Sequence, residues 1–256
     1  MYSLLKKLLF AFEPETAHAL VKKIAPLIPS GLIENYARIC NPSLQSAHFG
    51  ISFDNPVGLA AGFDKNGELI ELMTSLGFGY VEIGSVTFKK WEGNPLPRIF
   101  RLPKDASLIN RMGLPNCGAE AINERLARKK WKIPVGINIA KTPGSDEGSD
   151  VFVHIMKKMA PQASYFVLNL SCPNTPDGAT FEDPLSFLAL AEAVADQKKI
   201  QKNFPPILIK LSPDSDDKDL EKLVGMACEK GFDGFVLGNT TSDRRGLTTP
   251  EKNCQK

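Results

Sequence analysis

The residues with the clearest chemical potential lie together at positions 169–176, where the sequence reads NLSCPNTP. The thiol of Cys172 has an ordinary pKa of about 8.5, so it can accept a proton from carbon if neighbouring groups stabilise the thiolate. Asn169 and Asn174 offer hydrogen-bond donors and acceptors that suit a small polar ligand. The alternative is an ordinary turn, in which Asn and Ser side chains cap backbone groups beside an inert cysteine. This stretch alone leaves both interpretations open.

The elements that position this stretch follow a repeating pattern. From Pro56 onward, an apolar run is followed by a polar loop and then by a segment of helical period. The predicted strands are residues 57–61, 80–83, 133–137, 165–168, 207–209 and 234–237. The predicted helices between them include residues 66–76, 116–130, 185–201 and 217–230. This alternation predicts a parallel sheet.

Nearly every predicted strand ends at, or just before, a residue with a chemically useful side chain. These residues are Lys65, Ser85, Asn138, Asn169, Lys210 and Asn239. In a (β/α)₈ barrel the carboxyl ends of all strands converge on one mouth, whereas an open sheet would spread them along an edge. No glycine-rich dinucleotide motif follows the first strand. We therefore predict the α/β class and a TIM (β/α)₈ barrel that lacks its last two strands as given.

Two segments lie outside the repeat. Residues 87–115 separate the second and third strands, and their alternating runs predict a hairpin at the barrel mouth, where it could form a substrate loop. Residues 1–12 and 15–27 have helical apolar spacing and predict two short helices that pack on the core or rest on a membrane surface. We expect residues 1–41 to form a small N-terminal helical domain and residues 42–256 to form the barrel.

Composition narrows the function classes. A formal net charge of +2, without an aromatic–basic stripe, gives no reason to expect nucleic acid as a partner. The five cysteines are scattered and lack the spacing of a disulfide framework or a metal site, so we expect no metal. The first twelve residues, MYSLLKKLLFAF, superficially resemble a signal peptide, but their apolar part is short and no small-residue cleavage site follows. We expect this segment to be retained.

Eight motifs, in order along the chain, resemble the dihydroorotate dehydrogenases, flavoenzymes of pyrimidine synthesis. The motifs are LAAGFDKNGE (59–68), EIGSVT (82–87), GNPLPRIFRL (93–102), NRMG (110–113), GINI (136–139), NLSCPNTP (169–176), IKLSPD (209–214) and GNTT (238–241). The N-terminal helices, with EPETAHAL at 13–20, are similar to the quinone-using, membrane-associated class. Together the motifs cover nearly the whole chain.

The resemblance implies an FMN cofactor across the barrel mouth with dihydroorotate stacked on its ring. The positions that match FMN contacts in the family are Ala60, Ala61, Ser85, Asn138, Asn169, Lys210 and Gly238. Those that match the substrate site are Lys65, Asn110, Arg111, Met112, Gly113, Leu114, Asn169, Asn174, Asn239 and Thr240. Cys172 falls on the position of the catalytic base, which takes a proton from C5 of dihydroorotate while C6 loses a hydride.

The resemblance also implies the wider function. We expect oxidation of dihydroorotate to orotate in UMP synthesis, with a membrane quinone as acceptor. The N-terminal helices would make a peripheral contact with the cytoplasmic face of the cell membrane. In the family, the last two strands and the glycine-rich loops that hold the FMN phosphate follow the point where residue 256 lies. We therefore assign the activity to the parent protein and leave the activity of these 256 residues open.

One departure keeps alternatives open. The quinone class usually has serine where this chain has Cys172, and residues 113–116 (GLPN) also look like the soluble class. The first alternative is therefore a soluble-type dihydroorotate dehydrogenase that uses fumarate or NAD. The second is an inactive barrel fragment that binds no flavin and serves as an interaction module.

Overall fold

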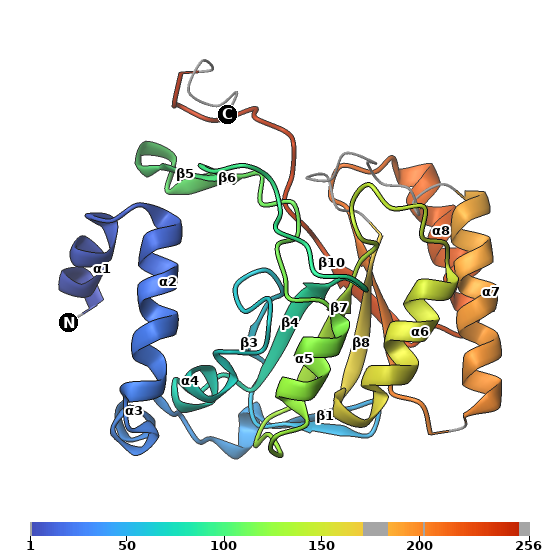
Figure 1. The fold of residues 1–256 in the computed structure, drawn as a ribbon, viewed down its shortest axis with the longest axis horizontal. Coiled ribbons are helices and arrows are strands. Elements are labelled where there is room, and N and C mark those ends of the chain that lie inside the picture. Colours follow the sequence, from blue (N-terminus) through green and yellow to red (C-terminus); the bar gives the residue numbers. More distant parts are fainter. Residues whose placement is uncertain (1, 171–183, 202, 251–256) are drawn as a thin grey trace.

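The computed structural model describes residues 2–170, 184–201 and 203–250, and its centre is a curled parallel sheet (Figure 1). The sheet has six strands in the order β10-β9-β8-β7-β4-β3. Their bounds are β3 (Gly58–Leu59), β4 (Tyr80–Val86), β7 (Val135–Ile139), β8 (Tyr165–Asn169), β9 (Ile207–Leu211) and β10 (Gly234–Leu237). Because the order in space follows the order in sequence and all pairs are parallel, each strand is joined to the next by a crossover. This half-barrel confirms the predicted fold class.

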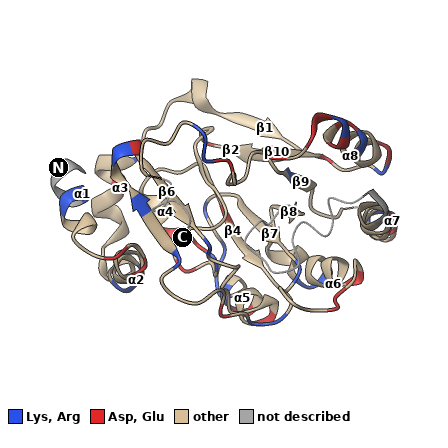
Figure 2. Ribbon diagram, turned by 90° about the horizontal axis from the view of Figure 1, so that it is seen from above, with Lys and Arg blue, Asp and Glu red and all other residues tan. Residues whose placement is uncertain are grey.

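Helices cover the outer face of the sheet, as the view from above shows (Figure 2). They are α4 (Ile70–Ser75), α5 (Ala119–Leu126), α6 (Asp150–Met159), α7 (Pro184–Ile200) and α8 (Asp217–Glu229). Positive and negative residues are interspersed along these helices. In α6 the residues Phe152, Ile155, Met156 and Met159 recur at helical spacing and are fully buried. The core therefore lies between the helices and the outward-facing side chains of the strands.

Several predicted boundaries were wrong at loops that side chains stabilise. The helix predicted at 66–76 begins only at Ile70, because the Asp64 carboxylate accepts hydrogen bonds from the backbone N–H groups of Glu68 and Leu69 at 2.8 and 2.7 Å. The helix predicted at 116–130 is shortened to α5, because the Asn116 side chain accepts a hydrogen bond from the backbone of Gly118. In both places the polar side chain stabilises a loop ahead of the first helical turn.

The predicted strands agree better. The runs at 165–168, 207–209 and 234–237 correspond to β8, β9 and β10. The run at 133–137 is shifted to Val135–Ile139, because Pro134 has no N–H to donate and the ladder begins after it. The run at 57–61 is reduced to the two residues of β3 at the sheet edge.

A short hairpin that sequence patterns did not predict closes the amino-terminal end of the sheet. It consists of β1 (Ser46–His48) and β2 (Ile51–Phe53), which pair antiparallel. The ring of Phe53 meets that of Tyr80 at the start of β4 edge to face, with centroids 5.5 Å apart. Phe49 lies against Gly234 at the start of β10. The hairpin therefore spans the bottom of the half-barrel from one strand to another.

The N-terminal segment is helical, as predicted, and lies beside the half-barrel at the left of Figure 1. Its elements are α1 (Tyr2–Phe10), α2 (Pro14–Ile24), a 3₁₀ turn (Ala25–Leu27) and α3 (Ser30–Ala37). Helix α3 was not predicted. Further 3₁₀ turns lie at Pro42–Leu44, Pro103–Asp105 and Ala160–Gln162. No helix among the described residues is long and apolar enough to cross a membrane.

The hairpin predicted in the 87–115 insertion is confirmed as β5 (Ile99–Leu102) and β6 (Ser107–Asn110), which pair antiparallel. It stands above the carboxyl ends of the strands and faces α1 and α2 (Figure 1). Leu102 and Ile109 form a small separate core with Phe100 and with Leu247, which comes from the chain after β10. The insertion therefore stands beside the barrel mouth, on the side of α2 (Figure 1).

Candidate active site

Four polar side chains from the strand ends form one hydrogen-bonded chain, which we call the strand-end cluster. Ser85 Oγ donates to Asn138 Oδ1 at 2.5 Å, and Asn169 Nδ2 donates to Ser85 Oγ at 2.9 Å. Asn239 Nδ2 donates to Asn169 Oδ1 at 3.4 Å. These residues come from β4, β7, β8 and the loop after β10. The structure thus brings together side chains that the sequence separates by more than 150 positions.

A buried carboxylate lies beneath this cluster, and sequence reasoning missed it. Glu82 of β4 is 5% exposed, and its Oε1 accepts a hydrogen bond from Asn138 Nδ2 at 2.8 Å. Burial raises the pKa of Glu82, while the Asn138 hydrogen bond and the positive charge of Lys210 act in the opposite direction. The signal in the sequence was an acidic residue inside a buried strand, where a charge needs a partner.

Lys210 is the matching cation inside the half-barrel. It lies on β9, in register with Asn169 on β8 and Val236 on β10, and is 9% exposed. Its charge is one of the influences on the Glu82 carboxyl. Buried charges are stable only when compensated, so the two residues support each other beneath the strand-end cluster.

Lys65 lies beyond β3 and is half-buried. Its ammonium group donates a hydrogen bond to the backbone carbonyl of Gly62. The pKa of Lys65 is lowered to about 8, chiefly by burial and next by the charge of Arg98, whereas the carboxylate of Glu15 acts in the opposite direction. Lys65 is therefore a cation at neutral pH and close to its titration point above it.

The loop after the β5–β6 hairpin carries the next group of predicted residues. Asn110 Oδ1 accepts a hydrogen bond from the backbone of Met112 at 3.4 Å. Arg111 does not point to the strand ends: its guanidinium donates to the carbonyl of Pro97 at 2.9 and 3.1 Å. Gly113 and Leu114 are buried. This loop is fixed from below, where Asn116 Nδ2 donates to Thr87 Oγ1 and to the carbonyl of Leu114 at 2.8 and 2.9 Å.

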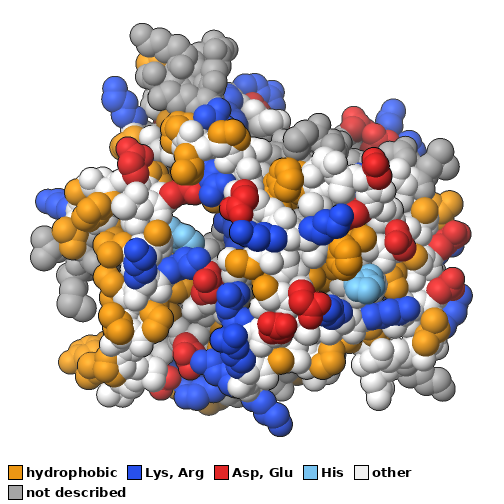
Figure 3. Space-filling view, viewed as in Figure 1, with side chains coloured by type: hydrophobic (Ala, Val, Ile, Leu, Met, Phe, Trp, Pro, Cys, Tyr) orange, Lys and Arg blue, Asp and Glu red, His pale blue; other side chains and the backbone are white. Residues whose placement is uncertain are grey.

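A large cavity, which we call the hairpin cavity, separates α1 and α2 from the β5–β6 hairpin and has a volume of about 1260 Å³. The space-filling view shows an open gap on this side of the molecule (Figure 3). Its lining is rich in apolar side chains, among them Phe10, Phe63, Leu96, Leu102, Leu108 and Met112. Its lining also includes Lys65, from the loop after β3, and Thr240, from the loop after β10. The cavity therefore joins an apolar space to the carboxyl ends of the strands.

Comparisons with known proteins agree with this arrangement. A family model described as dihydroorotate dehydrogenase matches residues 43–256. The chain is 40% identical to the dihydroorotate dehydrogenase (quinone) of Mycobacterium marinum, over 98% of this chain and 70% of that protein. The protein belongs to the dihydroorotate dehydrogenase family. The dihydroorotate dehydrogenase (quinone) of Natronomonas pharaonis is 38% identical over 95% of this chain and 70% of that protein.

Solved structures of dihydroorotate dehydrogenases share the fold. The crystal structure of the Eimeria tenella enzyme in complex with ferulenol matches with a TM-score of 0.83 and 31% identity. The match covers 94% of this chain and 70% of the Eimeria chain. A ligand-free structure of the same enzyme matches with a TM-score of 0.82. The chain thus corresponds to most, but not all, of the length of these dihydroorotate dehydrogenases.

The remaining predicted residues of the dihydroorotate dehydrogenase site are placed as follows. Ala60 and Ala61 follow β3, and Gly238 follows β10 with a φ of +101°. Ala60 and Ala61 therefore lie at one edge of the sheet and Gly238 lies at the other edge. Cys172 and Asn174 lie outside the described residues. Among those described, no group of three His, Cys, Asp or Glu side chains could hold a metal ion.

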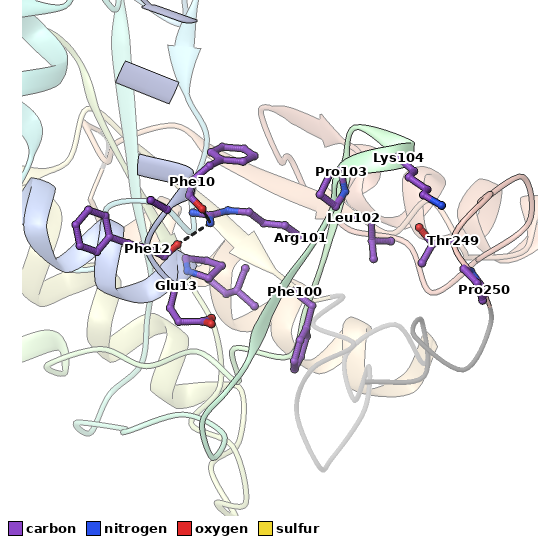
Figure 4. A pocket seen from close by; sticks show the side chains of 13 residues that line it. Phe10, Phe12, Glu13, Phe100, Arg101, Leu102, Pro103, Lys104, Thr249 and Pro250 are labelled. Atoms are coloured by element: carbon purple, nitrogen blue, oxygen red, sulfur yellow. Dashed lines mark hydrogen bonds between the residues drawn. The ribbon is translucent and has the colours of Figure 1, made fainter. Parts of the chain in front are cut away.

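A second pocket adjoins the hairpin cavity at the turn between α1 and α2 and has a volume of about 700 Å³ (Figure 4). Arg101 connects its two walls, because the guanidinium donates to the carbonyl of Phe12 at 2.7 Å and lies 4.3 Å from the ring centroid of Phe10. On the far side, Thr248 and Thr249 donate hydrogen bonds to the carboxylate of Asp105 at the hairpin turn. These contacts hold the hairpin between the N-terminal helices and the C-terminal segment.

Proposed function

We propose that the protein oxidises dihydroorotate to orotate and passes the electrons to a quinone, as part of pyrimidine synthesis. The curated relatives from Mycobacterium marinum and Natronomonas pharaonis carry the name of this activity. The single observation that carries the proposal is the hairpin cavity. It joins Lys65 and Thr240, at the polar strand ends, to an apolar space large enough for a quinone head group and the start of its tail.

The strand ends fit a flavin, and we propose FMN as the cofactor. The strand-end cluster presents amide and hydroxyl groups suited to the polar edge of an isoalloxazine ring. Gly62 and Gly238 each have open space where a Cβ atom would be, so no described side chain packs against either glycine there. The proposed FMN-binding residues are Ala60, Ala61, Ser85, Asn138, Asn169, Lys210 and Gly238. When bound, FMN supplies a hydride acceptor that can later release electrons singly or in pairs.

The chain's own residues would bind and orient the substrate. Dihydroorotate has a carboxylate and ring amide groups, so it needs a cation and several donor–acceptor side chains. We propose that the ammonium group of Lys65 pairs with the carboxylate. We propose that the ring amides contact the side chains that offer donors and acceptors, which are Asn110, Asn169, Asn174, Asn239 and Thr240. Arg111, Met112, Gly113 and Leu114 would shape the loop above the substrate, with the guanidinium of Arg111 bound to the carbonyl of Pro97.

Cys172 is the proposed general base. It follows Asn169, a member of the strand-end cluster, by three positions in the sequence, and this nearness in sequence supports the proposal. Its thiolate would take the proton from C5 of dihydroorotate while the hydride leaves from C6. Lys210 would offset the negative charge that gathers at the mouth during this step, since it is a buried cation beside the cluster.

The N-terminal helices are the proposed quinone and membrane segment. Exposed apolar side chains gather on them, including Leu8, Phe10, Leu27 and Leu32, which are 61%, 49%, 79% and 63% exposed. Within the hairpin cavity, His18 Nε2 donates to the carbonyl of Phe63 at 2.8 Å, and burial lowers the pKa of His18. The lowered pKa favours the neutral form of the imidazole in this cavity. We propose a peripheral contact with the cytoplasmic face of the cell membrane through these helices.

The second candidate is a soluble-type enzyme that uses fumarate or NAD, which the cysteine at position 172 favours. The experiment reduces the purified protein anaerobically with dihydroorotate and then offers a short-chain quinone, fumarate or NAD. We expect dihydroorotate to bleach the flavin absorbance and the quinone to restore it fastest. Faster reoxidation by fumarate or NAD would assign the protein to the soluble class. A colourless protein that gains no absorbance with added FMN would contradict both enzymatic functions.

A further inference from the structure

An ion pair joins helix α2 to the loop that precedes the β5–β6 hairpin. Glu15 Oε1 lies 2.9 Å from Arg98 Nε, and the two side chains are only 27% and 15% exposed. The guanidinium is fixed further, because it donates to the carbonyl of Glu92 at 2.8 Å and to that of Asn94 at 3.1 Å. A pair this well shielded interacts more strongly with its neighbours than a surface pair does.

This ion pair lies beside Lys65. Glu15, Arg98 and Lys65 all line the hairpin cavity, and they also line a smaller cleft of about 240 Å³ behind it. Three parts of the chain bring charged or titratable groups to this cleft: helix α2, the loop after β3, and the segment from residue 90 to residue 117. In addition to Lys65 itself, these groups are Glu15, His18, Lys22, Asp64, Glu68, Lys90, Glu92, Arg98 and Cys117.

The two members of the pair act on Lys65 in opposite directions. The pKa of Lys65 is about 8, below its ordinary value. Desolvation is the largest cause of this lowering, and the positive charge of Arg98 is the next. The carboxylate of Glu15 is the largest influence that raises this pKa. Lys22 lowers it and Asp64 raises it by smaller amounts. Without Glu15, the charge of Arg98 would therefore repel the ammonium group with only the weaker effect of Asp64 to offset it.

We infer that Glu15 is a positioning residue for the dihydroorotate half of the reaction: paired with Arg98 beside the cleft that Lys65 also lines, it favours the charged ammonium group that meets the substrate carboxylate. The inference rests on the proposed function, in which Lys65 binds that carboxylate. It gives helix α2 a role in substrate binding as well as in the proposed quinone site. Glu15 itself touches no reacting atom in this scheme.

The test measures the affinity of the holoenzyme for orotate, which carries the same carboxylate, by calorimetry between pH 6 and 9. In the wild-type protein the affinity should fall as the pH rises through about 8, because Lys65 loses its proton. Glu15→Gln should move this fall to lower pH, so that orotate binds several-fold more weakly at pH 8 and almost normally at pH 6. Arg98→Gln should move it to higher pH, and the double variant should lie near the wild type.

Opposite shifts of the pH midpoint in Glu15→Gln and Arg98→Gln would show that the charges of the pair act on Lys65. If the pair only stabilised the fold, both single variants would shift the midpoint in the same direction or leave it unchanged. Either result overturns the inference. If Arg98→Gln does not fold, Glu15→Gln decides alone, and an unchanged midpoint overturns it. Glu13→Gln removes the same charge from an exposed position at the start of α2 and should have no effect. Glu15→Asp, which retains the charge, should restore much of the wild-type profile.

A further variant keeps the inference distinct from the proposed function. Lys65→Met should weaken orotate binding at pH 6 and abolish the fall near pH 8. If Lys65→Met binds orotate normally, the proposed substrate site is wrong. If Lys65→Met weakens binding but Glu15→Gln leaves the midpoint in place, only the role of Glu15 is wrong.

Discussion

The strand-end cluster and the hairpin cavity adjoin each other, yet different contacts hold them in place. The cluster is a continuous set of hydrogen bonds between strands that are themselves paired over their length and backed by a buried core. The cavity is bounded by α1, α2 and the β5–β6 hairpin, which are connected mainly by Arg98 and Arg101. The two regions therefore differ in how rigidly their residues are held. Groups that react need fixed geometry, whereas an apolar acceptor tolerates a loosely packed wall.

Removal of residues 1–41 should separate the two regions most completely, because it removes the wall of the hairpin cavity that α1 and α2 form. In the full-length holoenzyme, the deletion should abolish reoxidation by a long-chain quinone and reduce sedimentation with lipid vesicles. Reduction of the flavin should persist at saturating dihydroorotate and neutral pH, because the strand-end cluster does not involve these residues. Stopped-flow measurement of the two half-reactions provides the test. Tyr36 lies on α3 and is itself 90% exposed, so Tyr36→Ser is a control that should leave both rates unchanged. Retained quinone activity after the deletion would favour the soluble class.

Substitution of the proposed base should affect the other half-reaction. Cys172→Ala should leave flavin binding intact and slow flavin reduction at least about a hundredfold, the lower bound for a lost general base. Cys172→Ser should be active mainly at higher pH, since a hydroxyl is a weaker acid than a thiol. The quinone half-reaction should remain normal in both variants. An unchanged pH profile in Cys172→Ser would show that another group titrates.

Variants of Glu82 and Lys210, the buried charged residues beneath the strand-end cluster, should distinguish an effect of charge on the flavin from an effect on protein stability. Lys210→Met should lower flavin occupancy and make the flavin reduction potential more negative, because a nearby cation favours the electron-rich form. It should also lower thermal stability, since Glu82 would be left buried without its cation. The double variant Lys210→Met/Glu82→Gln should recover stability but not the potential. If the potential of Lys210→Met equals that of the wild type, Lys210 has only a structural role.

The smallest expected effect concerns the contact between Asp105, at the turn of the β5–β6 hairpin, and the C-terminal segment beside the second pocket. Hydrogen bonds from Thr248 and Thr249 lower the pKa of Asp105 to about 2, below its ordinary value of 3.8. A lowered pKa in the folded state means that the contact contributes stability above about pH 4 and loses it as the pH falls toward 2. Amide exchange at Thr248 and Thr249 should therefore accelerate over this range. In Asp105→Asn the exchange should be faster at neutral pH and should change little on acidification.

The sequence predicted the parts of the fold that depend on periodicity and strand ends. Helices α7 and α8 and strands β8 to β10 follow apolar patterns long enough to be recognised. The convergence of Ser85, Asn138 and Asn169 followed from one rule, that parallel strands in a barrel end at the same mouth. The strands β1 and β2 were missed because three residues are too few to show a period.

The remaining features of the site depend on partners far apart in the sequence. Glu82 is visible in the sequence as a charge in a strand, but only the structure gives it Asn138 and Lys210 as neighbours. Glu15 and Arg98 are 83 positions apart, and neither stands out from ordinary surface charges. The late start of α4 depends on the local capping by Asp64, which propensity alone does not reveal.

The hydrogen bonds between Asp105 and residues 248 and 249 have a consequence for the order in which the molecule assembles. They span 143 and 144 positions, and Leu247 completes the small core beneath the hairpin. During synthesis the N-terminal helices, the hairpin and most of the sheet leave the ribosome well before these residues. The β5–β6 hairpin would therefore lack its contacts with residues 247–249 while the strands of the sheet fold beside it. We expect the β5–β6 hairpin to reach its final position only after β10 has folded.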